Sequence, residues 1–225
     1  MKANILIIAF AACSISSSNI NSEEIKTEAA KNVIELEPGP GWDILHMFSG
    51  KVNYYWFDTE NGEKLIKSRY RPDLKTVILF QKLEEPCECS RASWKWRVHS
   101  FPIGADEWHG PLKDSPGAVY VYFRTTFRQY VIKYVWSVAH PAGTSFPSDR
   151  SNFFNKMYYK VLEGPPPEKD AWKMEDVDLT ADFRKFFLDG ENGEVPPVSG
   201  LGILTDGDAT EMIVETDYAG FRLMK

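Results

Sequence analysis

The chain has 225 residues, of which 43% are hydrophobic, 26% charged and 14% aromatic. This length suits one domain, with or without a short tail, and the composition excludes a disordered chain. The 26 basic residues stand against 32 acidic ones, which gives a net charge of −6. A general nucleic-acid binder needs a basic face, so we expect no nucleic-acid partner.

The first residues read as a targeting segment. Residues 1–12 contain one lysine and then a short apolar run. The run is too short to cross a bilayer and is typical of a secretory signal peptide. Two alanines precede Cys13, which resembles a bacterial lipoprotein signal with Cys13 as the lipidated first mature residue. Phe10 departs from that pattern, and cleavage further along is the alternative.

This interpretation divides the chain into three parts: a signal peptide at 1–12, a polar tether at 13–32 and a folded domain at 33–225. The expected location is outside the cytoplasm, in the periplasm or at the outer membrane or cell surface. Contact with a membrane is expected only through a lipid on Cys13.

Short runs of β-branched and aromatic residues follow, separated by clusters of Gly, Pro, Asn and Asp. Such runs predict strands, here over residues 43–48, 53–58, 64–70, 76–83, 93–100, 118–124, 130–138, 155–163, 173–179, 199–205 and 212–225. One helix is predicted over 180–188, with Thr180 as N-cap and with Phe183, Phe186 and Phe187 on one apolar face. Many strands and one short helix predict a mostly β fold, a β-sandwich.

Alternation along two strands separates their faces. Trp94 and Trp96 share one face and are expected in the core, whereas Lys95 and Arg97 share the other. A face with two cations is expected to meet solvent or to line a polar groove, because unpaired charges are costly to bury.

Eight segments occur in an order that resembles a known bacterial family. They are WKWRV at 94–98, FPIGAD at 101–106, AVYVYF at 118–123, YVWS at 134–137, HPAGTSFP at 140–147, Gly164, TADFRKFF at 180–187 and TDGDAT at 205–210. Together they resemble domain-of-unknown-function family 3047, a set of exported β-rich proteins without an assigned activity. The pattern is also similar to galactose-binding jelly rolls, which is a likeness of fold and says little about function.

Cys87 and Cys89 are separated by a single residue. We expect loop cysteines without a special role. A disulfide that closes a strained small ring is the second possibility, and half of a metal site is the third.

The TDGDAT segment could hold a cation. Asp206 and Asp208 follow an apolar run, and Asp217 would add a ligand if the ends of the domain pair. Carboxylate oxygens are the ligands that calcium prefers. An ordinary turn built from Asp, Gly and Thr is the alternative and the one we favour. Calcium is therefore the only cofactor considered.

Aromatic and polar residues together suggest a ligand-binding surface. Its predicted members are Lys95, Arg97, Tyr120, Tyr134, Trp136 and His140. Trp108 is also expected to be exposed.

The sequence leaves three functions open. The first is a non-catalytic envelope module that binds a glycan or another polar ligand. The second is a structural or assembly protein that binds an envelope protein. The third is a glycan hydrolase or lyase that uses Asp206, Asp208 or His140. We favour the first, without catalysis.

Overall fold

The computed structural model describes residues 32–45 and 54–225. The predicted signal peptide, Cys13 and nearly all of the predicted tether lie outside this part. Within it, no helix is both long and apolar enough to cross a membrane.

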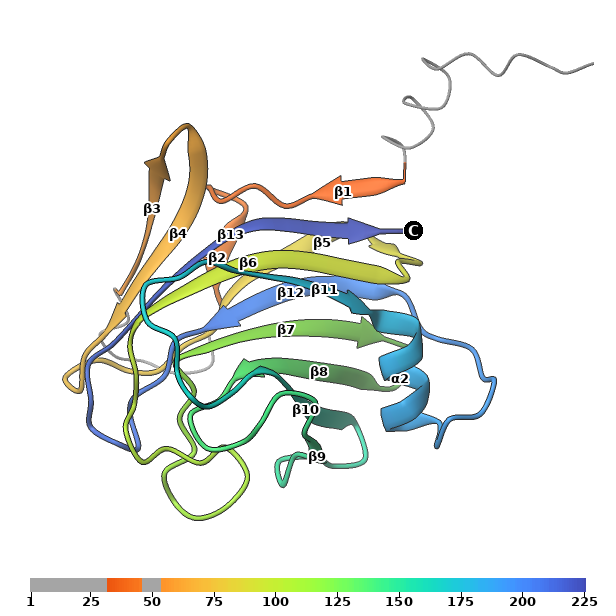
Figure 1. The fold of residues 1–225 in the computed structure, drawn as a ribbon. Coiled ribbons are helices and arrows are strands. Elements are labelled where there is room, and N and C mark those ends of the chain that lie inside the picture. Colours follow the sequence, from red (N-terminus) through yellow and green to blue (C-terminus); the bar gives the residue numbers. More distant parts are fainter. Residues whose placement is uncertain (1–31, 46–53) are drawn as a thin grey trace, which may run out of the picture. The chain divides into compact units, whose positions relative to one another are not determined.

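The described residues form two β-sheets (Figure 1). The six-stranded sheet has the order β11 (Lys173–Asp178), β6 (Arg91–Ser100), β13 (Val214–Met224), β4 (Glu63–Tyr70) and β3 (Tyr55–Glu60), with β1 (Val33–Glu35) also pairing with β13. The seven-stranded sheet has the order β2 (Trp42–Ile44), β5 (Leu79–Cys87), β12 (Val198–Leu204), β7 (Gly117–Arg124), β8 (Gln129–Trp136), β10 (Asn155–Glu163) and β9 (Ser145–Pro147). Neighbours are antiparallel except β8 and β10, which run parallel. The predicted β-sandwich is confirmed.

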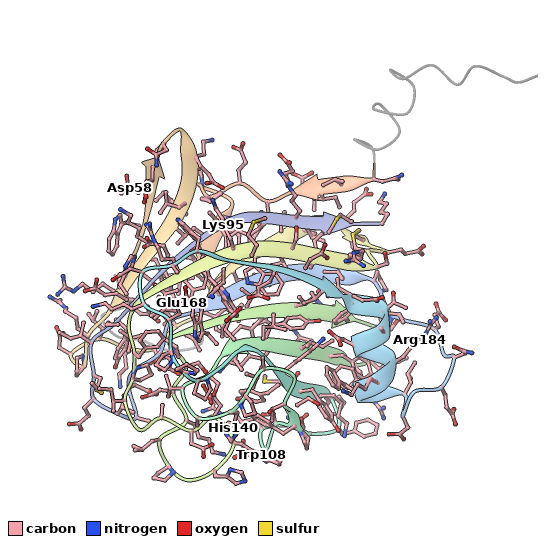
Figure 2. The ribbon with its side chains drawn as sticks, in the orientation of Figure 1. Asp58, Lys95, Trp108, His140, Glu168 and Arg184 are labelled. Carbon is pink, nitrogen blue, oxygen red and sulfur yellow. A yellow bond between two sulfur atoms is a disulfide. The ribbon has the colours of Figure 1, made fainter. Side chains whose placement is uncertain are left out.

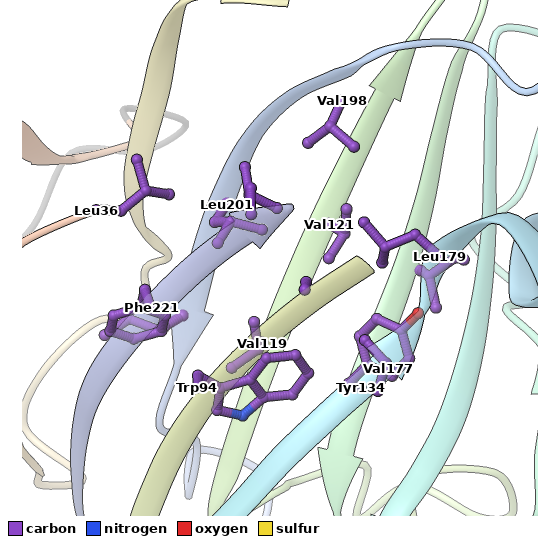
Figure 3. Close-up of a cluster of buried hydrophobic side chains, with 14 of the residues drawn as sticks. Leu36, Trp94, Val119, Val121, Tyr134, Val177, Leu179, Val198, Leu201 and Phe221 are labelled. Atoms are coloured by element: carbon purple, nitrogen blue, oxygen red, sulfur yellow. The ribbon is translucent and has the colours of Figure 1, made fainter. Parts of the chain in front are cut away.

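The main core lies between the two sheets. Trp94 and Trp96 of β6 are 2% and 0% exposed, which confirms the predicted inner face. They pack against the inward side chains of β7 and β8, including Val119 and Tyr134 (Figure 3). Strand alternation explains this arrangement, because every second residue of each strand points between the layers.

The helix α2 (Leu179–Phe187) packs at the end of the sandwich where β7 ends and β8 begins. The predicted apolar face is confirmed, since Phe183 and Phe186 are buried. The predicted N-cap is wrong: Asp178, not Thr180, accepts a hydrogen bond from the Ala181 backbone N–H at 2.8 Å. Its carboxylate is a better acceptor at a helix N-terminus than a hydroxyl oxygen, because it carries a full negative charge.

Two further predictions need correction. Cys87 and Cys89 form a disulfide, so they are not the unbonded loop cysteines that we expected. The short strands β1 and β9 were not predicted, because three residues are too few to show an alternating pattern.

Candidate functional site

The structure does not bring the six predicted ligand-binding residues together. Tyr134 and Trp136 are 0% and 1% exposed and lie in the core, against Trp94 and Trp96. Their place in a ligand-binding surface was therefore wrong. The face that they share is the inner one, because β8 lies between β7 and β10 in the seven-stranded sheet and this side of it is covered by the other sheet.

Lys95 and Arg97 lie on the outer face of the six-stranded sheet, away from the other predicted members. Lys95 Nζ pairs with Glu63 at 2.5 Å, and Arg97 pairs with Glu60 at 2.7 Å. Both cations also lie over the ring of Trp172, at 4.7 and 4.6 Å from its centre. These partners already satisfy the two charges, so this face does not offer them free to a ligand.

Asp217 also belongs to this outer face and not to the predicted metal group. Its Oδ2 accepts a hydrogen bond from Arg97 Nη2 at 2.6 Å and lies 2.9 Å from His99 Nε2. Its placement in a calcium site was wrong, because β13 carries it to the opposite sheet from Asp206.

Tyr120 lies on the outer face of the seven-stranded sheet, within a second aromatic cluster. We call this cluster the aromatic face; it comprises Phe80, Tyr120, Tyr122, Phe146 and Tyr159. Its rings form two groups: Phe80 and Tyr122 have centroids 5.1 Å apart, and Phe146 and Tyr159 stack at 4.9 Å. Two glycines of β12 make room for them. A Cβ at Gly200 would lie 2.5 Å from Phe80 Cζ, and one at Gly202 would lie 3.3 Å from Tyr122 Cε2.

Lys133 of β8 stands in the middle of the aromatic face. It is 3% exposed, and its Nζ lies 5.4 Å from the ring centre of Tyr120 and 4.8 Å from that of Tyr159. Among the described residues, no carboxylate forms a salt bridge with it. The alternation of side chains along β8 predicted that Lys133 lies on the opposite face from Tyr134 and Trp136. It did not mark Lys133 as a candidate site residue.

An acidic cluster lies where β12 ends and β7 begins. Asp114, Asp206 and Asp208 each offer a carboxylate oxygen, and these atoms lie within 4.8 Å of one another. Asp114 also accepts hydrogen bonds from the Ala209 and Thr210 backbone N–H groups, at 3.1 and 2.7 Å. Calcium at Asp206 and Asp208 thus stays a prediction, with Asp114 in place of Asp217. The hydrogen bonds of a plain turn are present as well.

The carboxyl group of Asp206 has a raised pKa. Burial, together with the nearby charges of Asp208 and Asp114, raises its pKa to about 7, against the partly opposing charge of Lys133. Between pH 3.8 and about 7 the folded chain therefore keeps a proton that the unfolded chain has released. The stability that this proton provides is full at low pH and is lost as the pH rises to about 7.

We expect Asp206→Asn to remove this pH dependence, because an amide does not titrate in this range. The free energy of unfolding of the wild type should fall relative to that of the variant between about pH 4 and about pH 7. Urea denaturation of both proteins in EDTA across this range measures the difference. Parallel curves for the two proteins would show that Asp206 titrates normally.

His140 lies in a third group, which we call the histidine cluster: Asp106, His109 and His140. It comes from the loop between β6 and β7 and the loop after β8. Trp108 is 43% exposed, as expected, and lies beside His140 with ring centroids 6.0 Å apart (Figure 2). The sequence predictions missed Asp106 and His109, because no metal-ligand spacing marks them.

The protein is thus a two-layer β-sandwich. The aromatic face, the acidic cluster and the histidine cluster lie on or beside the outer face of its seven-stranded sheet. The chain belongs to the family described as "Protein of unknown function (DUF3047)", whose model matches residues 41–222. This match confirms the resemblance found in the sequence. No curated protein matches the chain.

Solved structures with similar folds include three carbohydrate-active proteins. The xyloglucanase domain of NopAA, a type three effector from Sinorhizobium fredii in complex with cellobiose, has 8% identity and a TM-score of 0.48 over 86% of this chain and 94% of that one. Wild-type ENZbleach xylanase has 11% identity and a TM-score of 0.35 over 84% of each chain. The agarase AgWH50C has 10% identity and a TM-score of 0.37 over 86% of this chain and 24% of that one. At such values these likenesses carry no argument about function.

Proposed function

We propose that this protein binds a glycan on the aromatic face. The observation that carries the proposal is Lys133, an ammonium group that is 3% exposed and lies between Tyr120 and Tyr159 without a salt bridge to any described residue. Burying such a charge costs free energy, which the two rings only partly offset. Side chains whose burial is unfavourable occur most often at functional sites.

The groups around Lys133 suit a sugar better than a strongly charged ligand. Tyrosine hydroxyls are neutral at physiological pH, and burial raises the pKa of Tyr120 and of Tyr122 further above the usual value. Neither hydroxyl has a hydrogen-bond partner among the described side chains. Rings with a few convergent polar groups form the typical lining of a small-molecule site. Tyr120, Tyr122 and Tyr159 are only 5%, 7% and 9% exposed, so a ligand would reach these rings only after the side chains that cover them shift. A sugar offers C–H faces to such rings and hydroxyls to the polar groups.

The test is the variant Lys133→Met, which removes the ammonium and keeps a long side chain. We expect glycan binding to weaken by roughly tenfold or more, since a hydrogen bond from a charged donor is lost. Folding stability should change little, because removing the cost of burying the charge is offset by losing its attraction to the buried carboxylates of Asp206 and Glu107. Isothermal titration with neutral oligosaccharides of glucose, xylose, galactose or N-acetylglucosamine measures the first effect, and urea denaturation measures the second.

The matched control is Lys95→Met, on the outer face of the other sheet, where the same exchange should leave glycan binding unchanged. A Lys133→Met protein that binds like the wild type would contradict the proposal. So would one that loses stability and keeps its affinity, since Lys133 would then serve only the fold. Binding of none of the sugars by the wild type would favour a protein partner instead.

One observation favours glycan hydrolysis as a second candidate. Asp206 is buried with a pKa of about 7, whereas its neighbour Asp208 is exposed. Two carboxyl groups in such different surroundings can divide the roles of proton donor and acceptor. Release of reducing ends from the same sugars, abolished in Asp206→Asn, would establish this activity. Binding without any release would leave the protein as a binding module.

A further inference from the structure

We propose that Asp106, His109 and His140 bind a divalent transition-metal ion, of which zinc is the representative. His140 Nε2 lies 2.8 Å from Asp106 Oδ1, and His109 Nδ1 lies 3.5 Å from Asp106 Oδ2. One ligand atom from each residue lies within 4.8 Å of the others. Two ligand atoms on one tetrahedral zinc ion are roughly 3.3 Å apart, given bonds of about 2.0–2.1 Å. The three side chains therefore need only small shifts to bind an ion.

Backbone N–H groups hold the carboxylate of Asp106 in place. Asp106 Oδ1 accepts hydrogen bonds from the Trp108 and His109 N–H groups at 2.9 and 2.7 Å. The backbone therefore fixes the position of this carboxylate beside the two imidazoles.

Neighbours other than the ligands hold the backbone at His140 and the ring of His109. The His140 backbone N–H donates to Ser137 Oγ at 3.0 Å, and that hydroxyl donates to the buried carboxylate of Glu107 at 2.6 Å. The ring of His109 stacks on Trp108 at 4.6 Å, and Trp108 stacks on Phe146 at 4.9 Å with an interplanar angle of 2°. Such outer contacts orient metal ligands and are typical of built sites.

The donor set and its exposure indicate the class of metal. Two imidazole nitrogens with one carboxylate suit zinc and its first-row neighbours, whereas calcium and magnesium prefer oxygen ligands alone. The His109 side chain is 65% exposed and that of Asp106 is 30% exposed, so an ion can enter from solvent. Three protein ligands leave a position for water or for an oxygen atom of another molecule. This proposal does not depend on glycan binding.

The experiment is titration of untagged, EDTA-treated full-length protein with zinc, followed by calorimetry and by metal analysis after dialysis. We expect one zinc ion per chain. His109→Gln and His140→Gln should each weaken binding by roughly tenfold or more, since each removes a ligand. His109 is mostly exposed, so its variant should fold even where a change at His140 disturbs the loop.

The matched control is His99→Gln, since His99 also lies between two carboxylates, those of Asp170 and Asp217. Zinc affinity should survive in this variant. Absence of zinc uptake by the wild type would overturn the proposal and leave the His140–Asp106 contact as an ordinary hydrogen bond. Uptake that persists unchanged in both His109→Gln and His140→Gln would overturn it equally.

Discussion

Replacing Trp136 by alanine is expected to lower the free energy of unfolding by about 3–5 kcal/mol, the usual cost of deleting a large aromatic side chain from a core. Trp136 is 1% exposed and contacts the rings of Trp96 and Phe101, at 5.8 and 6.1 Å between centroids. The variant would leave a cavity between the two sheets, and the sheets could close it only by moving relative to each other. Urea or thermal denaturation of the variant and the wild type measures the loss.

Trp108→Ala is the matched control, because Trp108 is 43% exposed. It should cost much less stability, since much of this ring already meets solvent. The opposite pattern would contradict the assignment: if Trp136→Ala kept full stability but lost ligand binding, Trp136 would belong to an open binding surface after all.

Gly164→Ala is expected to destabilise the fold by about 1–3 kcal/mol, as overpacking does. Gly164 follows β10 and lies against the loop after β8. An added Cβ would lie 2.5 Å from the His140 carbonyl oxygen and 2.9 Å from the Ala142 backbone nitrogen. These are backbone atoms, so relief requires the loop itself to move. The variant should therefore also weaken zinc binding, because the same loop carries His140.

Gly39→Ala provides the comparison for this effect. Among the described residues, and apart from its two chain neighbours, none has an atom within 4 Å of a Cβ at Gly39, so the stability of this variant should change by only a few tenths of a kcal/mol. Equal stabilities of the Gly39 and Gly164 variants, measured in one denaturation series, would show that the loop after β8 can move without a loss of folding stability.

The sequence allowed the faces of the strands to be predicted, but not which face would be covered. Alternation placed Tyr134 and Trp136 together and Lys133 opposite them, and this division is confirmed. It could not show that both sides of β8 would be largely buried, because burial of the outer side depends on rings from β7, β9 and β10. For this reason Tyr134 and Trp136, which belong to the core, were predicted to lie in a ligand-binding surface.

The partners of Asp206 and His140 in the two polar clusters could not be predicted from the sequence, for a different reason. Asp114 meets Asp206, and His109 meets His140, only because loops from distant parts of the chain converge at one end of the seven-stranded sheet. A spacing rule detects ligands that share one turn or one strand. It cannot detect pairs that strand order brings together.

The most direct test of glycan binding on the aromatic face is a map of backbone amide signals by NMR during titration with the best-binding oligosaccharide. We expect the signals that change to belong to β7, β8, β10 and β12, centred on Tyr120, Lys133 and Tyr159. Signals of β3, β4 and β6 should stay in place. Changes confined to these last strands, around Arg97 and Trp172, would contradict the account and would move the binding surface to the other sheet.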